Sequence, residues 1–380
     1  MQEYMNRNLS GIALSGIRRV SMYAAAKGNV ACLTIGEPDF STPEAIKAAC
    51  KAALDRNETY YAPTWGLPRL REKIAAFEEK KHGLRYTADE VLLTAGATES
   101  LYLAFCGTCN PGDEVIIPTP AFGLYESLSK VCGAVPVRVE TVDDGFQLTP
   151  EKLAAAITPK TKAILLNSPN NPTGTVLSRE TLRGIRDLVA GKPIFVICDD
   201  VYNQLVYGAC PSFAAEFPEL RKQTIVCQSF SKPYAMTGWR MGYLLADAAV
   251  AAPLSVLHQN IMTCLPTPQQ YGCMEALDQD ISEMLTDYRN RRDYICGRLD
   301  AMGLPYVRPQ GAFYVFPDFR NYNSDSYALC MEMIDQGGVA GIPGVFFGAE
   351  GFMRFSYCYS MEEIKTAMDR LEVFLKNYKK

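Results

Sequence analysis

Histidine is scarce in this chain, which has only His82 and His258 among its 380 residues. Zinc sites are usually built from several histidine and cysteine ligands, and a Ser-His-Asp triad needs a histidine as its base. The phosphate-binding motif GxxxxGK[ST] of nucleoside triphosphatases is missing as well. These absences disfavour the most familiar protein-only chemistries, so any reaction is expected to depend on an organic cofactor.

Long apolar runs and an excess of positive charge are also missing. No window of about 18 apolar residues occurs, so no transmembrane helix is expected. The N-terminal stretch MQEYMNRNLSGIALSGIRRV carries charges throughout and lacks the apolar centre of a signal peptide. The net charge is −4, and no basic stripe is available to neutralise nucleic-acid phosphates. We therefore expect a cytoplasmic protein that binds neither membranes nor nucleic acids.

Cysteine, by contrast, occurs thirteen times. Without a secretory signal these residues are expected to be reduced thiols and not a disulfide framework. Cys106 and Cys109 have the CxxC spacing of metal and redox sites, but the chain has no second CxxC and the pair follows the helical pattern TESLYLAF. We therefore interpret both as packed or surface thiols.

The middle of the chain alternates short apolar runs with helical patterns. The runs predict five strands, at residues 114–120, 161–169, 193–200, 224–232 and 239–246. Strands that are rich in Val and Ile and separated by helices are typical of a buried, mostly parallel sheet. A sheet of this kind is therefore the predicted centre of the molecule.

The C-terminal part of the chain has a different pattern. A long charged helix is predicted at 282–302, and further helices around 327–336 and from 361 onwards. Between them lie the strand-like stretches GAFYVFPDF and FMRFSYCY. Such a tail is typical of a small α+β domain. The predicted organisation is a large domain at 45–280 and a small domain formed by 1–44 and 281–380.

Polar side chains follow three of the predicted strands. Asn171 comes after the second strand, Asp199 and Tyr202 come at and after the end of the third, and Lys232 closes the fourth. In an open α/β sheet the carboxyl ends of the strands line the ligand crevice. These residues are therefore expected to meet at one site.

The residue types at this site fit the requirements of pyridoxal phosphate. Its aldehyde binds a lysine amine, its ring nitrogen a carboxylate, its phenolic oxygen hydrogen-bond donors, and its phosphate a helix start with hydroxyls and an arginine. An amino-acid substrate needs an arginine for its carboxylate. The candidates, in that order, are Lys232, Asp199, Asn171 with Tyr202, the stretch TAGATES with Ser229 and Arg240, and Arg354. Each is ordinary when taken alone, and their joint occurrence indicates the cofactor.

Motifs in a fixed order run along nearly the whole chain: IGEPDFSTP, YAPTWGLPRLREKIA, TAGATESLYLAF, NSPNNPTG, CDDVYNQLVY, SFSKPYAMTGWRMGY, RPQGAFYVF and FMRFSY. In this order they resemble the class I/II pyridoxal-phosphate-dependent aminotransferases of fold type I, and among them the bacterial aspartate/aromatic aminotransferase-like branch. The resemblance implies an α/β fold with a large, mostly parallel seven-stranded sheet domain and a small α+β domain. It also implies pyridoxal 5'-phosphate as the cofactor.

The resemblance assigns roles to individual residues. Lys232 would bind the aldehyde of the cofactor and move the substrate proton, with Asp199 on the ring nitrogen and Tyr202 on the phenolic oxygen. The other residues that would contact cofactor or substrate are Ala97, Thr98, Ser229 and Arg240 at the phosphate, Phe122 on the ring, Asn171 at the phenolic oxygen and the substrate, and Gly36 with Arg354 at the substrate carboxylate. Tyr61 would reach the phosphate of the neighbouring subunit, which implies a homodimer with shared active sites.

The expected reaction is a ping-pong transamination, in which an L-amino acid gives its amino group to a 2-oxo acid such as 2-oxoglutarate. Aspartate-preferring relatives in this branch often carry a basic residue where Thr98 stands, which disfavours a strict aspartate donor. Trp65 and the Tyr60–Tyr61 pair favour aromatic or broad donors, although scaffold positions explain them equally well. The N-terminal motifs also resemble relatives acting on acylated diaminopimelate. A C–S β-lyase or decarboxylase on the same fold, and a non-enzymatic effector domain, remain alternatives.

Overall fold

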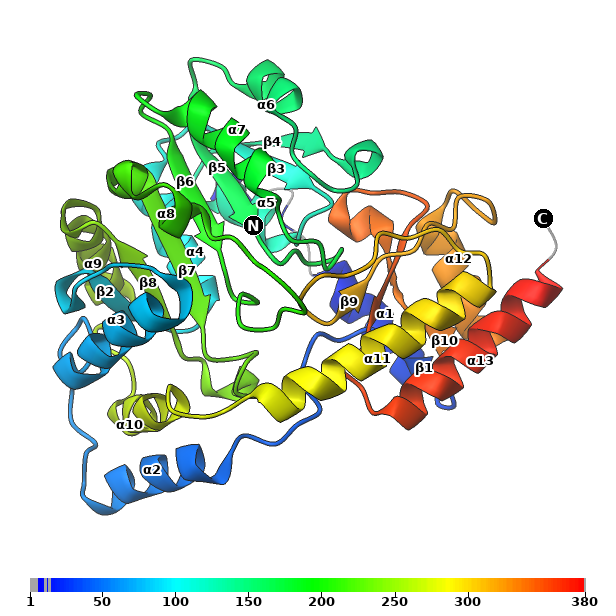
Figure 1. The fold of residues 1–380 in the computed structure, drawn as a ribbon, viewed down its shortest axis with the longest axis horizontal. Coiled ribbons are helices and arrows are strands. Elements are labelled where there is room, and N and C mark those ends of the chain that lie inside the picture. Colours follow the sequence, from blue (N-terminus) through cyan, green and yellow to red (C-terminus); the bar gives the residue numbers. More distant parts are fainter. Residues whose placement is uncertain (1–5, 10–11, 13–14, 379–380) are drawn as a thin grey trace.

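The computed structural model describes residues 6–9, 12 and 15–378. Its centre is a seven-stranded sheet in the order β2-β8-β7-β6-β5-β3-β4 (Figure 1). The strands are β2 (Val91–Thr94), β3 (Glu114–Thr119), β4 (Val135–Glu140), β5 (Thr161–Asn167), β6 (Phe195–Asp199), β7 (Thr224–Ser229) and β8 (Gly242–Ala246). β8 runs antiparallel to β7 and to β2, whereas the remaining pairs are parallel. The predicted α/β class and mostly parallel sheet are confirmed.

Both faces of the sheet are apolar because successive side chains of a strand point to opposite sides. One face carries Ile164 and Val226, which pack against α3 (Pro68–His82) and α7 (Arg179–Val189). The other face carries Leu165 and Ile225. They pack in one cluster with side chains of the helices α4 (Ala97–Thr108), α5 (Leu124–Val131) and α9 (Ala248–Met262). The molecule therefore has helix, sheet and helix layers at its centre.

The five predicted strands are all present, but their ends differ. The strand expected at 239–246 begins only at Gly242, because Thr237–Trp239 form a 3₁₀ turn and Arg240 adopts a left-handed φ of 52°. β7 stops at Ser229, where the polar turn begins. Two strands of the large sheet have no counterpart in the predictions. β2 is only four residues long, and the edge strand β4 contains Pro136, which weakens a strand pattern.

Further helices surround this centre. They are α2 (Glu44–Asp55), α6 (Pro150–Ala156), α8 (Phe213–Glu216) and α10 (Thr267–Ala276). The two helices α2 and α10 pack against each other along one end of the molecule (Figure 1).

Two small sheets lie outside the large one, and the first of them joins the two ends of the chain. β1 (Ala31–Cys32) pairs in parallel with β10 (Val339–Ala340). The second sheet has the antiparallel order β11 (Ile342–Pro343), β12 (Met353–Ser356) and β9 (Tyr314–Val315). The helices beside them are α1 (Gly16–Lys27), α11 (Ser282–Ala301), α12 (Ser326–Glu332) and α13 (Met361–Asn377). The helix predicted at 327–336 is thus α12 continued by a π-helical turn at Met333–Gly337.

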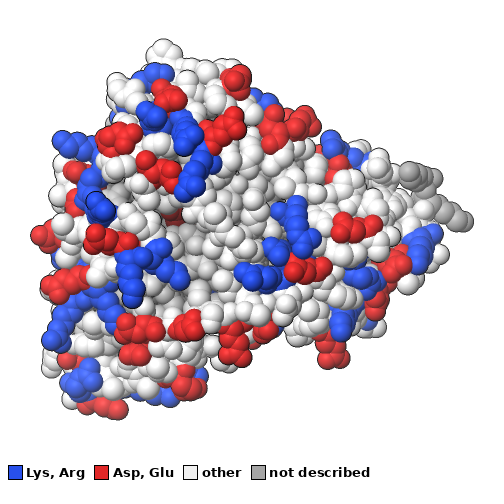
Figure 2. All heavy atoms as spheres, viewed as in Figure 1, with Lys and Arg blue, Asp and Glu red and all other residues white. Residues whose placement is uncertain are grey.

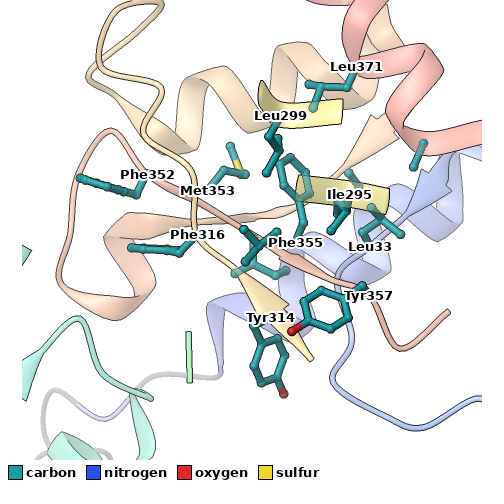
Figure 3. Close-up of a cluster of buried hydrophobic side chains, with 14 of the residues drawn as sticks. Leu33, Ile295, Leu299, Tyr314, Phe316, Phe352, Met353, Phe355, Tyr357 and Leu371 are labelled. Carbon is teal, nitrogen blue, oxygen red and sulfur yellow. The ribbon is translucent and has the colours of Figure 1, made fainter. Parts of the chain in front are cut away.

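Figure 3 shows the apolar cluster that the two small sheets form with the helices beside them. Leu33 of the N-terminal segment lies beside Ile295 of α11 and Phe355 of β12, and all three are buried. Because this cluster joins residues from both ends of the chain, the segment around Leu33 is fixed to the C-terminal tail. The domain boundaries at 44/45 and 280/281 stay predictions.

Acidic and basic side chains are intermixed on the face shown in Figure 2, around a hollowed central area with few charges. Within the described ranges no helix is long and apolar enough to cross a membrane. All thirteen cysteines are free thiols, with Cys106 half-buried and Cys109 buried. No group of three or more His, Cys, Asp or Glu side chains in the described part could hold a metal ion.

Candidate active site

Polar residues lie together at the carboxyl ends of the central strands, among them the predicted Asp199 and Ser229. Asn167 closes β5, Asp199 closes β6, and the two are direct partners in the parallel ladder. Ser229 closes the next strand, β7, and faces Gly242 of β8. The carboxyl edge of three adjacent strands therefore presents an amide, a carboxylate and a hydroxyl side by side.

Lys232 lies three residues beyond the end of β7. Its Nζ donates a hydrogen bond to the carbonyl oxygen of Gly36 at 2.6 Å and lies 5.9 Å from the centre of the Phe313 ring. Burial disfavours the charged ammonium form and lowers the pKa of Lys232 to about 8. This amine is therefore far closer to an uncharged nucleophile at neutral pH than an exposed lysine.

Asp199 is almost completely buried beside it. Its Oδ2 accepts a hydrogen bond of 2.6 Å from the Tyr125 hydroxyl, and its backbone carbonyl accepts one of 2.8 Å from Asn167 Nδ2. Burial raises the pKa of Asp199 to about 6. Its Oδ1 is buried and has no hydrogen-bond partner among the described residues. One oxygen is thus held in place, and the other is available to a ligand N–H group.

An anion-binding cradle lies at the start of α4. Gly96 caps the helix with φ 73° and ψ 172°, a conformation that is essentially restricted to glycine. A Cβ at this position would come within 2.7 Å of Arg240 Nη2, and a Cβ at Gly242 would come within 2.9 Å of the Ala97 nitrogen. The helix start, the guanidinium and Ser229 therefore converge. The first N–H groups of a helix have no partner within it and favour an anion.

Arg354 of β12 forms the opposite side of the site. Its Nη1 donates to Asn171 Oδ1 at 2.9 Å and its Nη2 to the carbonyl oxygen of Thr34 at 2.6 Å, while its Nε is buried without a partner in the described structure. The guanidinium lies 4.5 Å from the centre of the Tyr314 ring, and the Tyr314 and Tyr202 hydroxyls are 2.9 Å apart. A buried, well-oriented guanidinium of this kind is suited to bind a carboxylate.

Gly36 and Phe122 complete the set within one chain. A Cβ at Gly36 would lie 1.9 Å from the Tyr314 hydroxyl oxygen, so only glycine lets this segment lie so close to Tyr314. The Phe122 ring meets the Tyr125 ring edge-on, with centroids 5.9 Å apart, and is therefore close to Asp199 through Tyr125. Trp65 packs in the same apolar cluster as Phe122.

Tyr61 is also a predicted site residue, but within the described part of one chain it has no contact with the other residues of the site. It is 89% exposed, and its neighbour Tyr60 is 82% exposed. Two adjacent tyrosines with so much apolar area in solvent are unusual for a surface without a partner.

Three residues that support the site were not predicted: Tyr125, Asn167 and Tyr314. Tyr125 and Tyr314 stand inside the stretches AFGLY and GAFYVF, where alternating apolar residues hide them. A signal was present for Tyr125, because it stands in the first turn of a helix that follows the carboxyl end of a central strand. Asn167 ends a strand, as Asp199 does, and could have been found by the same argument.

Comparisons with known proteins agree with this geometry. Residues 29–371 match the family model of aminotransferase class I and II. The chain is 39% identical to a probable N-acetyl-LL-diaminopimelate aminotransferase of Bacillus subtilis, over 99% of this chain and 96% of that protein. It is 36% identical to an aromatic-amino-acid aminotransferase of Thermococcus litoralis, over 96% of each chain. The solved aspartate aminotransferase of Rhizobium meliloti superposes with a TM-score of 0.95 at 33% identity, covering 99% of each chain.

The sequence, the fold and the arrangement of the site lead to one assignment. The predicted branch is confirmed, since relatives of the aspartate, aromatic and N-acetyl-diaminopimelate type all align over nearly the full length. The family depends on pyridoxal phosphate. This chain belongs to the class I and II aminotransferases and is an enzyme of that type.

Proposed function

We propose that the protein binds pyridoxal 5'-phosphate at this site and moves an amino group from an L-amino acid to 2-oxoglutarate. The observation that carries the proposal is the convergence of three groups at one sheet edge. They are the Lys232 amine with its lowered pKa, the unpartnered Asp199 Oδ1, and the cradle formed by Gly96 and Arg240.

The residues fit the cofactor group by group. The unpartnered Oδ1 of Asp199 would accept the ring N–H, and Asn171 and Tyr202 would bond the phenolic oxygen. The N–H groups of Ala97 and Thr98, the Ser229 hydroxyl and Arg240 would hold the phosphate, and Phe122 would lie against the ring. When bound, pyridoxal phosphate supplies an electron sink that stabilises the negative charge left on the substrate Cα.

The chain itself would orient the substrate and move its proton. Arg354 would bind the substrate carboxylate together with the Gly36 segment, exchanging its present bonds to Asn171 and Thr34. Lys232, with an amine that is partly uncharged at neutral pH, would take the proton from the substrate Cα and deliver it to the C4′ carbon of the cofactor. Asp199 stays ionised more readily when a cationic ring nitrogen faces it, which keeps that nitrogen protonated.

The proposed donor is an aromatic, broad or acylated diaminopimelate-type amino acid in preference to strict aspartate. Because residue 98 is a threonine, the first turn of α4 has no basic side chain that could bind the second carboxylate of an aspartate donor. Trp65 and Phe122 share an apolar cluster near the Asp199 side of the site, which suits a large donor. The exposed Tyr60 and Tyr61 support a homodimer, in which Tyr61 would complete the phosphate site of the partner subunit.

A donor panel tests the proposal. Purified protein is incubated with pyridoxal phosphate, 2-oxoglutarate and, one at a time, aspartate, phenylalanine, tyrosine and N-acetyl-LL-diaminopimelate. Glutamate should form in equal amount to the 2-oxo acid produced, and Lys232→Ala should abolish it. Release of ammonia or CO₂ without glutamate would assign a lyase or decarboxylase instead. Aspartate as the only donor used would contradict the proposed specificity.

A further inference from the structure

A buried hydrogen-bonded pair of polar side chains lies behind the proposed phosphate cradle. Glu99 and His258 are 7% and 0% exposed, and His258 Nδ1 lies 2.8 Å from Glu99 Oε1. His258 is one of the two histidines of the chain and stands on α9, which packs against α4. Neither residue has a role in the proposed reaction. Burying a carboxylate and an imidazole together is costly unless both are held by hydrogen bonds.

The second oxygen of Glu99 reaches back to the main chain. Glu99 is the third residue of α4, and its Oε2 accepts a hydrogen bond from the backbone N–H of Ala95. Ala95 directly precedes Gly96, which caps the helix and touches Arg240. The carboxylate therefore fixes the peptide on one side of Gly96, while the N–H groups of Ala97 and Thr98 stay free of helical partners.

A carboxylate in this position also has an electrostatic cost. The start of a helix attracts anions, and a buried negative charge in its first turn competes with an incoming phosphate. The hydrogen bond from His258 draws the Glu99 carboxylate toward α9 and offsets part of its charge. Without this donor, Glu99 would be an uncompensated buried carboxylate, which would loosen its bond to Ala95 and repel the phosphate. Both effects would weaken the binding of the phosphate.

We propose that Glu99 and His258 form a positioning pair, which fixes Ala95 and Gly96 so that the start of α4 can bind the cofactor phosphate. The inference rests on the proposed function, because it needs the phosphate to lie at this helix start. The pair acts on the phosphate and not on the ring. It should therefore govern how strongly the protein prefers pyridoxal 5'-phosphate over pyridoxal, which lacks the phosphate.

The test measures this preference directly. Apoprotein is titrated with pyridoxal 5'-phosphate and, separately, with pyridoxal, and both dissociation constants are taken from the change in absorbance. The preference is the ratio of the dissociation constant for pyridoxal to that for pyridoxal 5'-phosphate. In His258→Phe the ratio should fall by about tenfold or more, with the affinity for pyridoxal unchanged. Glu99→Ala loses the bond to Ala95 but also removes the repelling charge, so its ratio should fall by less. His258→Asn, which keeps an N–H donor near the place of Nδ1, should retain most of the preference. Should Glu99→Ala not fold, the two His258 variants decide.

A matched control separates positioning from general stability. Glu363 is the third residue of α13, and its Oε2 likewise accepts a backbone N–H, that of Ser360, at 2.9 Å. Glu363→Gln should leave the ratio unchanged, whatever its effect on the melting temperature. Variants at Glu99 and His258 that weaken both ligands equally, or neither, would overturn the inference alone. A wild-type protein with no preference for the phosphate form would overturn both the inference and the proposed cradle.

Discussion

At the residue scale, the site depends on one amine that is easy to deprotonate. Burial of the Lys232 amine is the main cause of its lowered pKa; Cys358 and Glu37 act next and raise the pKa, and the positive charges of Arg354 and Arg240 lower it by less. The balance lowers its pKa to about 8. An ordinary lysine has a pKa of about 10.4 and would be almost fully charged at neutral pH.

This pKa predicts how apoprotein captures its cofactor. Only the uncharged amine can attack the aldehyde, so the rate of binding should rise with pH and level off above about 8. Stopped-flow absorbance after mixing apoprotein with pyridoxal 5'-phosphate over a range of pH gives the midpoint. Lys232→Ala supplies the baseline without covalent capture. A midpoint near that of an exposed lysine would show that burial does not tune this amine.

At the element scale, the decisive feature is the glycine at the start of α4. Gly96→Ala would force a Cβ into a conformation reserved for glycine and toward the Arg240 guanidinium. We expect the affinity for pyridoxal 5'-phosphate to fall by about tenfold or more, since strain of this kind costs roughly 1–3 kcal/mol. Gly297→Ala is the control, because Gly297 is exposed within α11 and a Cβ there meets nothing within 4 Å.

The control variant should gain stability without any change in cofactor affinity. In a helix interior Ala is more stable than Gly by roughly 0.5–1 kcal/mol, so Gly297→Ala should raise the melting temperature and keep cofactor affinity. Differential scanning fluorimetry of the apoproteins and cofactor titration measure both quantities. Unaltered cofactor binding in Gly96→Ala would mean that the phosphate lies elsewhere.

The same scale shows what could be predicted from the sequence. The proximity of Lys232, Asp199 and Asn171 could be predicted, because the carboxyl ends of neighbouring parallel strands must meet. Asn171 is bonded to Asn167 beside Asp199, and Lys232 lies close enough to influence the pKa of Asp199. The strand β2 was missed, since a run of only four residues, VLLT, has no period to distinguish it from a helix. Tyr314 was missed because it meets Tyr202 only in the folded chain, through a contact between residues 112 positions apart.

At the scale of the whole molecule, the site is assembled from distant parts of the chain. Gly36 belongs to the N-terminal segment, Lys232 to the turn after β7 of the large sheet, and Arg354 to the C-terminal tail. Asp39 accepts a 2.7 Å hydrogen bond from Arg291 of α11, and Phe40 lies beneath the same guanidinium. The segment that carries Gly36 is thus anchored a few residues further on. A contribution from a second subunit would extend this composite design.

Mixing two inactive variants tests whether the sites are shared between subunits. In a homodimer with shared sites, Lys232→Ala destroys each site from one subunit and Tyr61→Ala impairs it from the other. A mixed dimer would hold one site with Lys232 and Tyr61 both intact. After subunit exchange, random pairing should restore about a quarter of the wild-type transaminase activity. Exchange is verified by mass spectrometry of the native dimers. If exchange occurs and activity stays at the level of the separate variants, Tyr61 does not serve the neighbouring site.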